Sequence, residues 1–119
     1  ALPGLSQYLT VLVTHMGLAQ GEAKNAVQTV LDAREEGAPT LLMGDFNLTP
    51  DSPLLTPLRA HFQDAAALLA PGEDLSYPSD VPERKIDYIM TAGPIEIDHA
   101  AIPAIVVSDH RPHTAVLRL

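Results

Sequence analysis

Short apolar stretches, separated by polar segments that contain Pro or Gly, predict an alternation of strands and helices along this chain. Residues 8–14 (YLTVLVT) are aliphatic and β-branched, and the stretch is too short for a free helix, so we interpret it as a buried strand. Residues 21–37 predict an amphipathic helix, because apolar side chains recur there every three or four positions, and Gly37 and Pro39 end it. Residues 40–43 (TLLM) predict a second buried strand.

The second half of the chain predicts mostly strands. Residues 48–57 are rich in Pro, Thr, Asp and Ser, and they predict a loop that leads into a helix over residues 58–69. Residues 70–83 contain a Gly and several Pro and predict a long irregular segment. Further strands are predicted at residues 85–91, 95–100, 104–108 and 114–119.

The order of these elements predicts an α+β fold, or a mixed α/β layered one, rather than a regular βαβ repeat. The chain has 119 residues and no internal boundary, so residues 1–119 are expected to form a single domain. If both helices cover one face of a sheet, the opposite face is apolar and uncovered. This pattern is a first indication that a second layer of the fold is missing from the chain.

The composition excludes several kinds of site. Cys is absent, which rules out disulfides, thiolate metal sites and a Cys nucleophile. No apolar run approaches the length of a membrane-spanning helix, and no signal-peptide pattern is present. The net charge of −8 repels the phosphate backbone, so nucleic acid is a possible partner that the charge does not favour. Acidic residues gathered in one place can instead hold a divalent cation.

Three predicted apolar strands end at polar residues, and a fourth has an acid near its start. Strand ends on one edge of a sheet, joined by the start of an antiparallel neighbour, can lie close together, and active sites are commonly built on such loops. We therefore expect one rim of the sheet to gather six side chains: His15, Asp45, Asn47, Asp87, Asp109 and His110.

These residue types suit the hydrolysis of a phosphate ester. Carboxylates and an amide oxygen can hold a hard cation such as Mg²⁺, which neutralises phosphoryl charge. A His paired with a carboxylate can orient water or stabilise the transition state. Each feature also has a structural explanation: residues 44–47 as a tight turn, residues 108–110 as an Asx turn, and His15 as a satisfied histidine at a strand end. Asp87 lies between apolar neighbours, so its carboxylate needs a polar partner. If none of these residues had a catalytic function, all of the separate structural explanations would have to be true at once.

At these residues the chain resembles the endonuclease/exonuclease/phosphatase family. Four motifs carry the resemblance, in the family's order and over nearly the whole chain: THMG at 14–17, GDFN at 44–47, IDYI at 86–89 and SDHRP at 108–112. The resemblance implies a sandwich of two sheets flanked by helices and built from two similar halves, of which this chain is the C-terminal one. It also implies that activated water hydrolyses a phosphodiester or phosphomonoester, with one or two Mg²⁺ or Mn²⁺ ions.

The resemblance further implies a role for each residue. His15 would contact the scissile phosphate and assist the leaving group. Asp45 would position or deprotonate the attacking water and also contact the metal, with Asn47 binding phosphate or water beside it. Asp109 would be a metal ligand.

The last motif and its neighbours complete the implied set. His110 would hydrogen-bond a phosphoryl oxygen, and Asp87 would orient His110. Three positions depart from the family's pattern: Lys85 stands where Arg is frequent, Met16 replaces a common Leu, and His113 occupies a position that is usually apolar. We interpret Met16 as neutral packing and His113 as a structural or rim residue.

The family's N-terminal half supplies an Asn at a strand end and a Glu that is the main metal ligand, and neither is recognisable here. Residues 1–7 are too few for either, and Glu22, Glu35 and Glu36 lie on the predicted helix. We therefore expect the isolated chain to bind Mg²⁺ weakly and to catalyse poorly. Its partners are then a phosphate-ester substrate and either the missing N-terminal half or a second copy, as a homodimer.

Two other functions are compatible with the same residues. The chain could be a catalytically inactive fragment or binding module that retains the motifs and recruits a partner through its exposed face. It could also be a metal-independent acid/base enzyme that uses Asp87 and His110. The complete set of four motifs favours the phosphoesterase over both.

Overall fold

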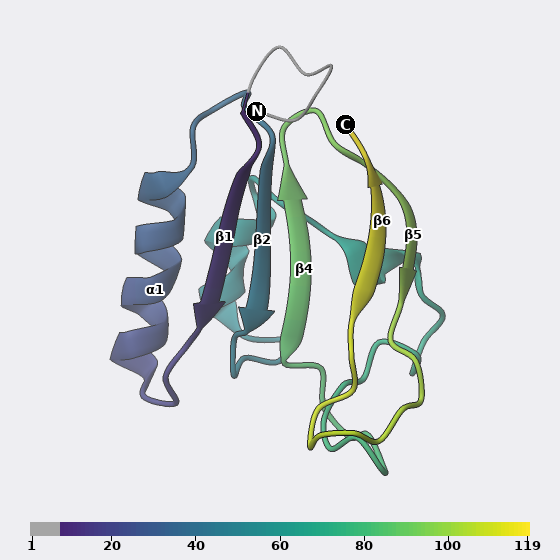
Figure 1. The fold of residues 1–119 in the computed structure, drawn as a ribbon. Helices are drawn as coiled ribbons and strands as arrows, with labels where there is room; N and C mark the ends of the chain where they lie inside the picture. The colour runs from purple at the N-terminus through teal and green to yellow at the C-terminus, as the bar shows by residue number, and fades with distance from the viewer. Residues whose placement is uncertain (1–7) are drawn as a thin grey trace.

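The computed structural model describes residues 8–119 and contains two β-sheets with few helices (Figure 1). The strands are β1 (Thr10–His15), β2 (Thr40–Asp45), β3 (Gln63–Asp64), β4 (Asp87–Ala92), β5 (Glu96–Ala101) and β6 (Thr114–Arg118). The helical elements are α1 (Gln20–Ala33), α2 (Thr56–Arg59) and two 3₁₀ turns, η1 (Pro53–Leu55) and η2 (Ala65–Leu68). The four-stranded sheet has the order β1-β2-β4-β3, and β5 and β6 form a separate pair. The predicted α+β class is therefore confirmed.

The helix predicted over residues 58–69 is wrong. α2 ends at Arg59, and the chain then pairs with β4 as the short strand β3 before it enters η2. The carboxylate of Asp64 accepts a hydrogen bond from the backbone N–H of Ala66 at 2.9 Å and thereby caps η2. Pairing at the edge of the sheet and this cap outweigh the helix propensity of the Ala- and Leu-rich stretch.

The strand predicted over residues 104–108 is also wrong. The backbone N–H of Ile105 donates to the carbonyl of Pro103 at 2.8 Å, a contact that turns the chain instead of extending it. Val106 and Val107 are exposed, and residues 104–108 pair with no strand in the described part of the chain. A β-branched run has strand propensity, but without a partner it forms no ladder.

One face of the four-stranded sheet carries the main core. α1 and α2 lie on this face (Figure 1). The alternation along β4 turns Tyr88 and Met90 toward the helices, where they pack with Leu42, Leu55 and Leu58. No helix among residues 8–119 is long and apolar enough to cross a membrane.

The opposite face is covered only in part. Ile89 of β4 is buried against Ala65 and Ala100, because η2 and the β5–β6 pair lie over that side of the sheet. On β1, by contrast, Val11 is 48% exposed and Val13 is 72% exposed. The expected uncovered apolar face is therefore present at β1, whereas the β4 side is closed by the second sheet.

Candidate active site

The strand register aligns three chemically active side chains on the partly covered face. β1 runs parallel to β2, and β4 runs antiparallel, so both β1 and β2 end where β4 begins. His15 is paired with Asp45, and Asp45 is paired with Asp87. Directly paired residues on adjacent strands project to the same face, so these three form a cross-strand row at the edge of the sheet.

His110 lies next to this cross-strand row and comes from the loop between β5 and β6. Its Nδ1 lies 2.7 Å from Oδ2 of Asp87, and its Nε2 lies 3.6 Å from Oδ2 of Asp45. His15 approaches the same Asp45 oxygen, with its Nε2 at 3.5 Å. The first contact is a strong charge-assisted hydrogen bond, while the two longer ones are electrostatic contacts beyond normal hydrogen-bond length.

The electrostatics of the site favour a protonated His110. Burial alone lowers the pKa of His110, but the hydrogen bond to Asp87 and the charges of Asp87 and Asp45 outweigh it, so the pKa is raised above its ordinary value. His15 is different, because its side chain is 76% exposed. The site therefore combines one oriented imidazole, which is a good hydrogen-bond donor, with one accessible imidazole at the rim.

Ser76 is a site residue that the sequence patterns do not reveal. It is fully buried, and its hydroxyl donates to Oδ2 of Asp87 at 2.7 Å, the same oxygen that contacts His110. Ser76, Asp87 and His110 thus form one hydrogen-bonded chain. Ser76 lies in the predicted irregular segment, eleven positions before Asp87, and no periodicity or motif in the sequence joins the two residues.

The GDFN motif shapes the end of β2. Phe46 turns inward and stacks on Tyr88 with ring centroids 4.6 Å apart, while Asp45 projects to the other face. Asn47 adopts a left-handed conformation with φ 52°, which Asn tolerates better than most residues. Its backbone N–H donates to Oδ1 of Asp45 at 2.9 Å, and its side-chain amide donates to the carbonyl of Met16 at 2.6 Å. The motif therefore fixes Asp45 and ties β2 to the loop after β1.

The donor atoms at this edge suit a hard divalent cation only in part. Ligand atoms of Asp45, Asp87 and His110 lie within 4.8 Å of one another. Asp87 already accepts from Ser76 and His110 through one oxygen, and Mg²⁺ prefers oxygen to imidazole nitrogen. Asp109 lies outside this close group; it is exposed, and its Oδ1 accepts from the Ser108 hydroxyl at 3.1 Å. Within the close group, Asp45 and Asp87 supply the carboxylate oxygens, which are the ligand atoms that a hard divalent cation prefers.

Lys85 and His113 lie beside the site, but both side chains are packed into the fold. Lys85 is only 4% exposed, its Nζ lies 3.3 Å from Oδ2 of Asp64, and the ammonium is 4.5 Å from the ring centroid of Tyr88. Burial lowers the pKa of His113, and the charge of Lys85 lowers it further. Both ring nitrogens of His113 are buried and have no hydrogen-bond partner within residues 8–119.

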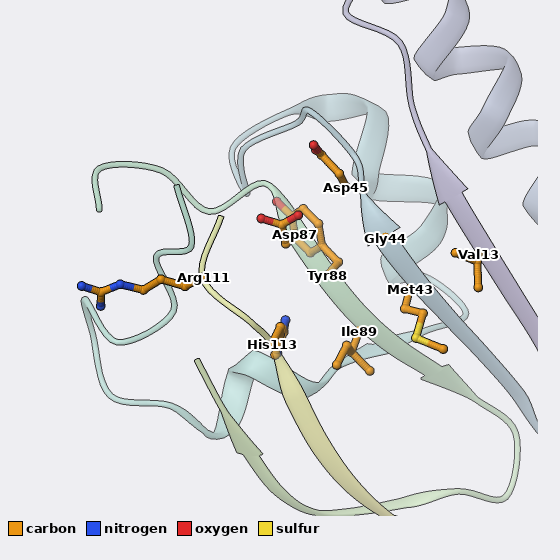
Figure 2. A pocket seen from close by; sticks show the side chains of 9 residues that line it. All are labelled: Val13, Met43, Gly44, Asp45, Asp87, Tyr88, Ile89, Arg111 and His113. Carbon is orange, nitrogen blue, oxygen red and sulfur yellow. The ribbon is translucent and has the colours of Figure 1, made fainter. Parts of the chain in front are cut away.

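Two clefts meet at the cross-strand row. One, of about 290 Å³, runs from Asp45 and Asp87 along the apolar side chains of Val13, Met43 and Ile89 (Figure 2). Figure 2 shows the guanidinium of Arg111 pointing away from these residues and His113 at the start of β6 facing them. The other cleft, of about 400 Å³, is lined by His15, Met16, Gly17, Leu18 and Asn47. The two carboxylates thus line the first cleft, and His15 lines the second.

Comparison with solved structures supports the same fold. The chain is similar to a conserved protein of unknown function from Enterococcus faecalis V583, with a TM-score of 0.81 and 22% identity over 98% of this chain and 52% of that one. It is similar to a mannosyl-6-phosphatase from Bacteroides thetaiotaomicron VPI-5482, with a TM-score of 0.72 and 16% identity over 92% and 51%. It is also similar to TDP2 from D. rerio in complex with a single-strand DNA product, with a TM-score of 0.66 and 18% identity over 92% and 56%. The chain spans about half the length of these structures.

Comparison with curated proteins gives no match. The sequence profile described as "Endonuclease/Exonuclease/phosphatase family", however, matches residues 12–110. This match covers most of the chain and includes the whole cross-strand row and His110. The chain therefore belongs to the endonuclease/exonuclease/phosphatase family.

Proposed function

We propose that this chain forms the water- and phosphate-handling part of a hydrolase that cleaves phosphodiesters or phosphomonoesters with a divalent metal. The observation that carries the proposal is the convergence of two imidazoles on one carboxylate oxygen, Oδ2 of Asp45, with His110 oriented by Asp87 at 2.7 Å. A phosphoryl group bound at this edge would meet hydrogen-bond donors and a water-activating carboxylate together.

These positions are compatible with the following reaction. Asp45 orients a water molecule and accepts its proton as the water oxygen bonds to phosphorus. His110 donates a hydrogen bond to a phosphoryl oxygen, and Asp87 holds the imidazole in place through Nδ1. As the bond from phosphorus to the ester oxygen breaks, His15, which is exposed at the rim, contacts the phosphate and protonates the leaving oxygen. Asn47 binds phosphate or water beside Asp45.

Asp45 and Asp109 would hold a Mg²⁺ or Mn²⁺ ion. The chemistry that such an ion supplies is neutralisation of phosphoryl charge and activation of water. Without substrate, two carboxylates give only a weak site for Mg²⁺, because the ion usually takes substrate phosphates as ligands in addition to one or two carboxylates and several waters. The charge of −8 disfavours duplex DNA as substrate, since non-specific DNA binding depends on basic residues.

We also propose that a further layer of protein covers the exposed side of β1. Val11 and Val13 are exposed next to the cleft that leads to the site, and the matched structures are about twice as long as this chain. The layer would be the N-terminal half of a longer parent, or a second copy when that half is absent. Large exposed apolar patches are uncommon on monomers, because covering them removes apolar surface from water.

Two measurements on the 119-residue chain test the function. The first is hydrolysis of bis(p-nitrophenyl) phosphate and p-nitrophenyl phosphate with Mg²⁺ or Mn²⁺, before and after EDTA. The second is line broadening of backbone amide NMR signals by Mn²⁺, which locates a weak metal site without requiring turnover. We expect slow hydrolysis that EDTA abolishes, and broadening centred on residues 45–47 and 108–110.

The matched variants are Asp45→Asn and Asp32→Asn. Both remove one negative charge, but Asp32 is exposed on α1, away from the site, and accepts a hydrogen bond from Gln28. Asp45→Asn should abolish both the hydrolysis and the local broadening, and Asp32→Asn should change neither. Hydrolysis that survives EDTA would favour the metal-independent acid/base enzyme. Intact folding with no hydrolysis and no localised broadening would favour the binding module, and fast turnover by the chain alone would refute the need for a further layer.

A further inference from the structure

The motif of residues 108–112, which carries Asp109 and His110, has no secondary structure of its own. The chain between β5 and β6 forms no helix or strand, and residues 105–109 are exposed. An exposed irregular segment normally moves more than the elements that it connects. His110 nevertheless meets Asp87 at 2.7 Å, so another part of the molecule must hold the motif in place.

Ser79 makes several hydrogen bonds to this motif. It is only 3% exposed, and each of its polar groups bonds to the motif. Its backbone N–H donates to the carbonyl of Asp109 at 2.9 Å, its hydroxyl donates to the carbonyl of Ser108, and its carbonyl accepts from Nε of Arg111 at 2.8 Å. One residue thus bonds to three residues of the motif, on both sides of His110.

Neighbouring residues extend the same contact. The carbonyl of Ser76 accepts from the backbone N–H of Arg111 at 2.7 Å, and the Tyr77 ring packs on the His110 imidazole with centroids 4.9 Å apart. Tyr77 is in turn paired through its backbone with Arg84, which closes residues 77–84 into a loop. The segment of residues 76–79 therefore hydrogen-bonds to a motif that has no secondary structure of its own.

We propose that Ser79 is a positioning residue, which holds the backbone of Ser108 and Asp109 so that the His110 imidazole faces the cross-strand row. The chemical importance of this role rests on the function proposed above, but the positional role itself does not. Ser79 contacts neither substrate nor reacting atoms in this scheme. Its hydroxyl and backbone act on the reaction only through Asp109 and His110.

The test measures the position of His110 directly, by NMR on the intact 119-residue chain with isotope-labelled histidine. In the wild type we expect a downfield resonance for the Nδ1 proton bonded to Asp87, and nuclear Overhauser contacts between the rings of Tyr77 and His110. In Ser79→Ala we expect the downfield resonance to disappear through exchange with solvent and the Tyr77 contacts to weaken. Signals of β1, β2 and β4 away from the site should stay in place.

Ser52→Ala is the matched control, because it also removes one serine hydroxyl that bonds to backbone: Ser52 accepts from the N–H of Leu54 at 3.3 Å and caps η1. It should lower the midpoint of denaturant unfolding yet leave the His110 signals unchanged. Ser79→Thr, which keeps the hydroxyl, should restore the downfield resonance that Ser79→Ala loses. A His110 spectrum in Ser79→Ala identical to that of the wild type would overturn the proposal.

A second variant keeps the proposal testable if Ser79→Ala does not fold. Arg111→Met removes the donor to the Ser79 carbonyl from the other side of the contact and keeps most of the apolar stem. It should broaden the backbone amide signals of Asp109 and His110, and unchanged signals would again overturn the proposal. None of these measurements requires hydrolysis, so a failure of the proposed catalytic function leaves them interpretable.

Discussion

Gly44 lies directly before Asp45, and we expect an added methyl group at this position to displace the strands that carry the site. Its φ is 147°, a backbone conformation that L side chains rarely adopt. An added Cβ would lie 1.8 Å from the carbonyl oxygen of Thr14, the residue paired with Gly44 across β1 and β2. Gly44→Ala therefore forces β1 and β2 apart immediately beside His15 and Asp45.

The size of the effect follows from two separate costs. Holding Ala at a strongly positive φ costs about 1–3 kcal/mol. Moving the Thr14 oxygen from 1.8 Å to at least 3.0 Å from the Cβ shifts backbone in a paired strand, and overpacking of this kind costs about 1–3 kcal/mol. The sum, about 2–6 kcal/mol, is a large part of the 5–15 kcal/mol that roughly bounds the stability of a domain. We expect Gly44→Ala to lower the free energy of unfolding by about 2–6 kcal/mol, which would unfold the protein only if its stability lies at the low end of the range for a domain.

Urea denaturation measures these costs, and two other glycine variants separate them. Gly37 has φ 79° with no atom within 4 Å of an added Cβ, so Gly37→Ala should show the conformational cost alone, about 1–3 kcal/mol. Gly21 lies in α1 with open space around it and no positive φ, so Gly21→Ala should stabilise by roughly 0.5–1 kcal/mol. A Gly44→Ala protein no less stable than Gly37→Ala would refute the reasoning, because the clash with Thr14 would then be absent.

Three further expectations concern the site and its surroundings. Ser76→Ala should lower the free energy of unfolding by about 1.5–3 kcal/mol in urea denaturation, because the half-buried carboxylate of Asp87 loses a donor. A loss near zero would contradict that bond. The pKa of His110 is raised in the folded protein. Its pairing with Asp87 therefore stabilises the fold fully at pH values below the ordinary pKa of 6.5, and this stabilisation is lost as the pH rises through the higher pKa of the folded state. The difference in unfolding free energy between wild type and Asp87→Asn should accordingly shrink at alkaline pH, and a difference independent of pH would count against it. Val13 is 72% exposed, so Val13→Thr should change the stability of the monomer by less than about 0.5 kcal/mol. The same variant should weaken self-association, measured by sedimentation velocity. A wild-type chain that is monomeric at all concentrations would exclude the homodimer.

Much of the fold follows from local pattern. The strands β1, β2 and β4 were predictable because aliphatic and β-branched runs of that length have few other stable conformations. α1 was predictable from its helical periodicity, although it ends at Ala33, earlier than the Gly37 expected. The two failures, residues 58–69 and 104–108, have strong local propensity for a structure that tertiary contacts do not support.

The residues of the candidate site also fall into two groups: those that the sequence predicts and those that only the structure reveals. Six candidate residues could be selected from sequence because each lies in one of the four motifs by which the chain resembles the family: His15, Asp45, Asn47, Asp87, Asp109 and His110. Ser76 and Ser79 could not, since their importance comes from hydrogen bonds to residues 11 and about 30 positions away, and serines in an irregular segment carry no local signal.

The sequence by itself therefore determined which residue types are present, which segments form the central strands, and which side chains have the chemistry for phosphate hydrolysis. Only the tertiary structure decided that His15, Asp45 and Asp87 stand in one row, because that depends on the register between strands distant in the chain. It also decided that Ser79 hydrogen-bonds to residues 108, 109 and 111, and that the second sheet leaves Val11 and Val13 of β1 exposed. The physical reason is the same in each case: propensity and periodicity act between near neighbours, whereas register, loop support and burial depend on contacts that form only when the chain has folded.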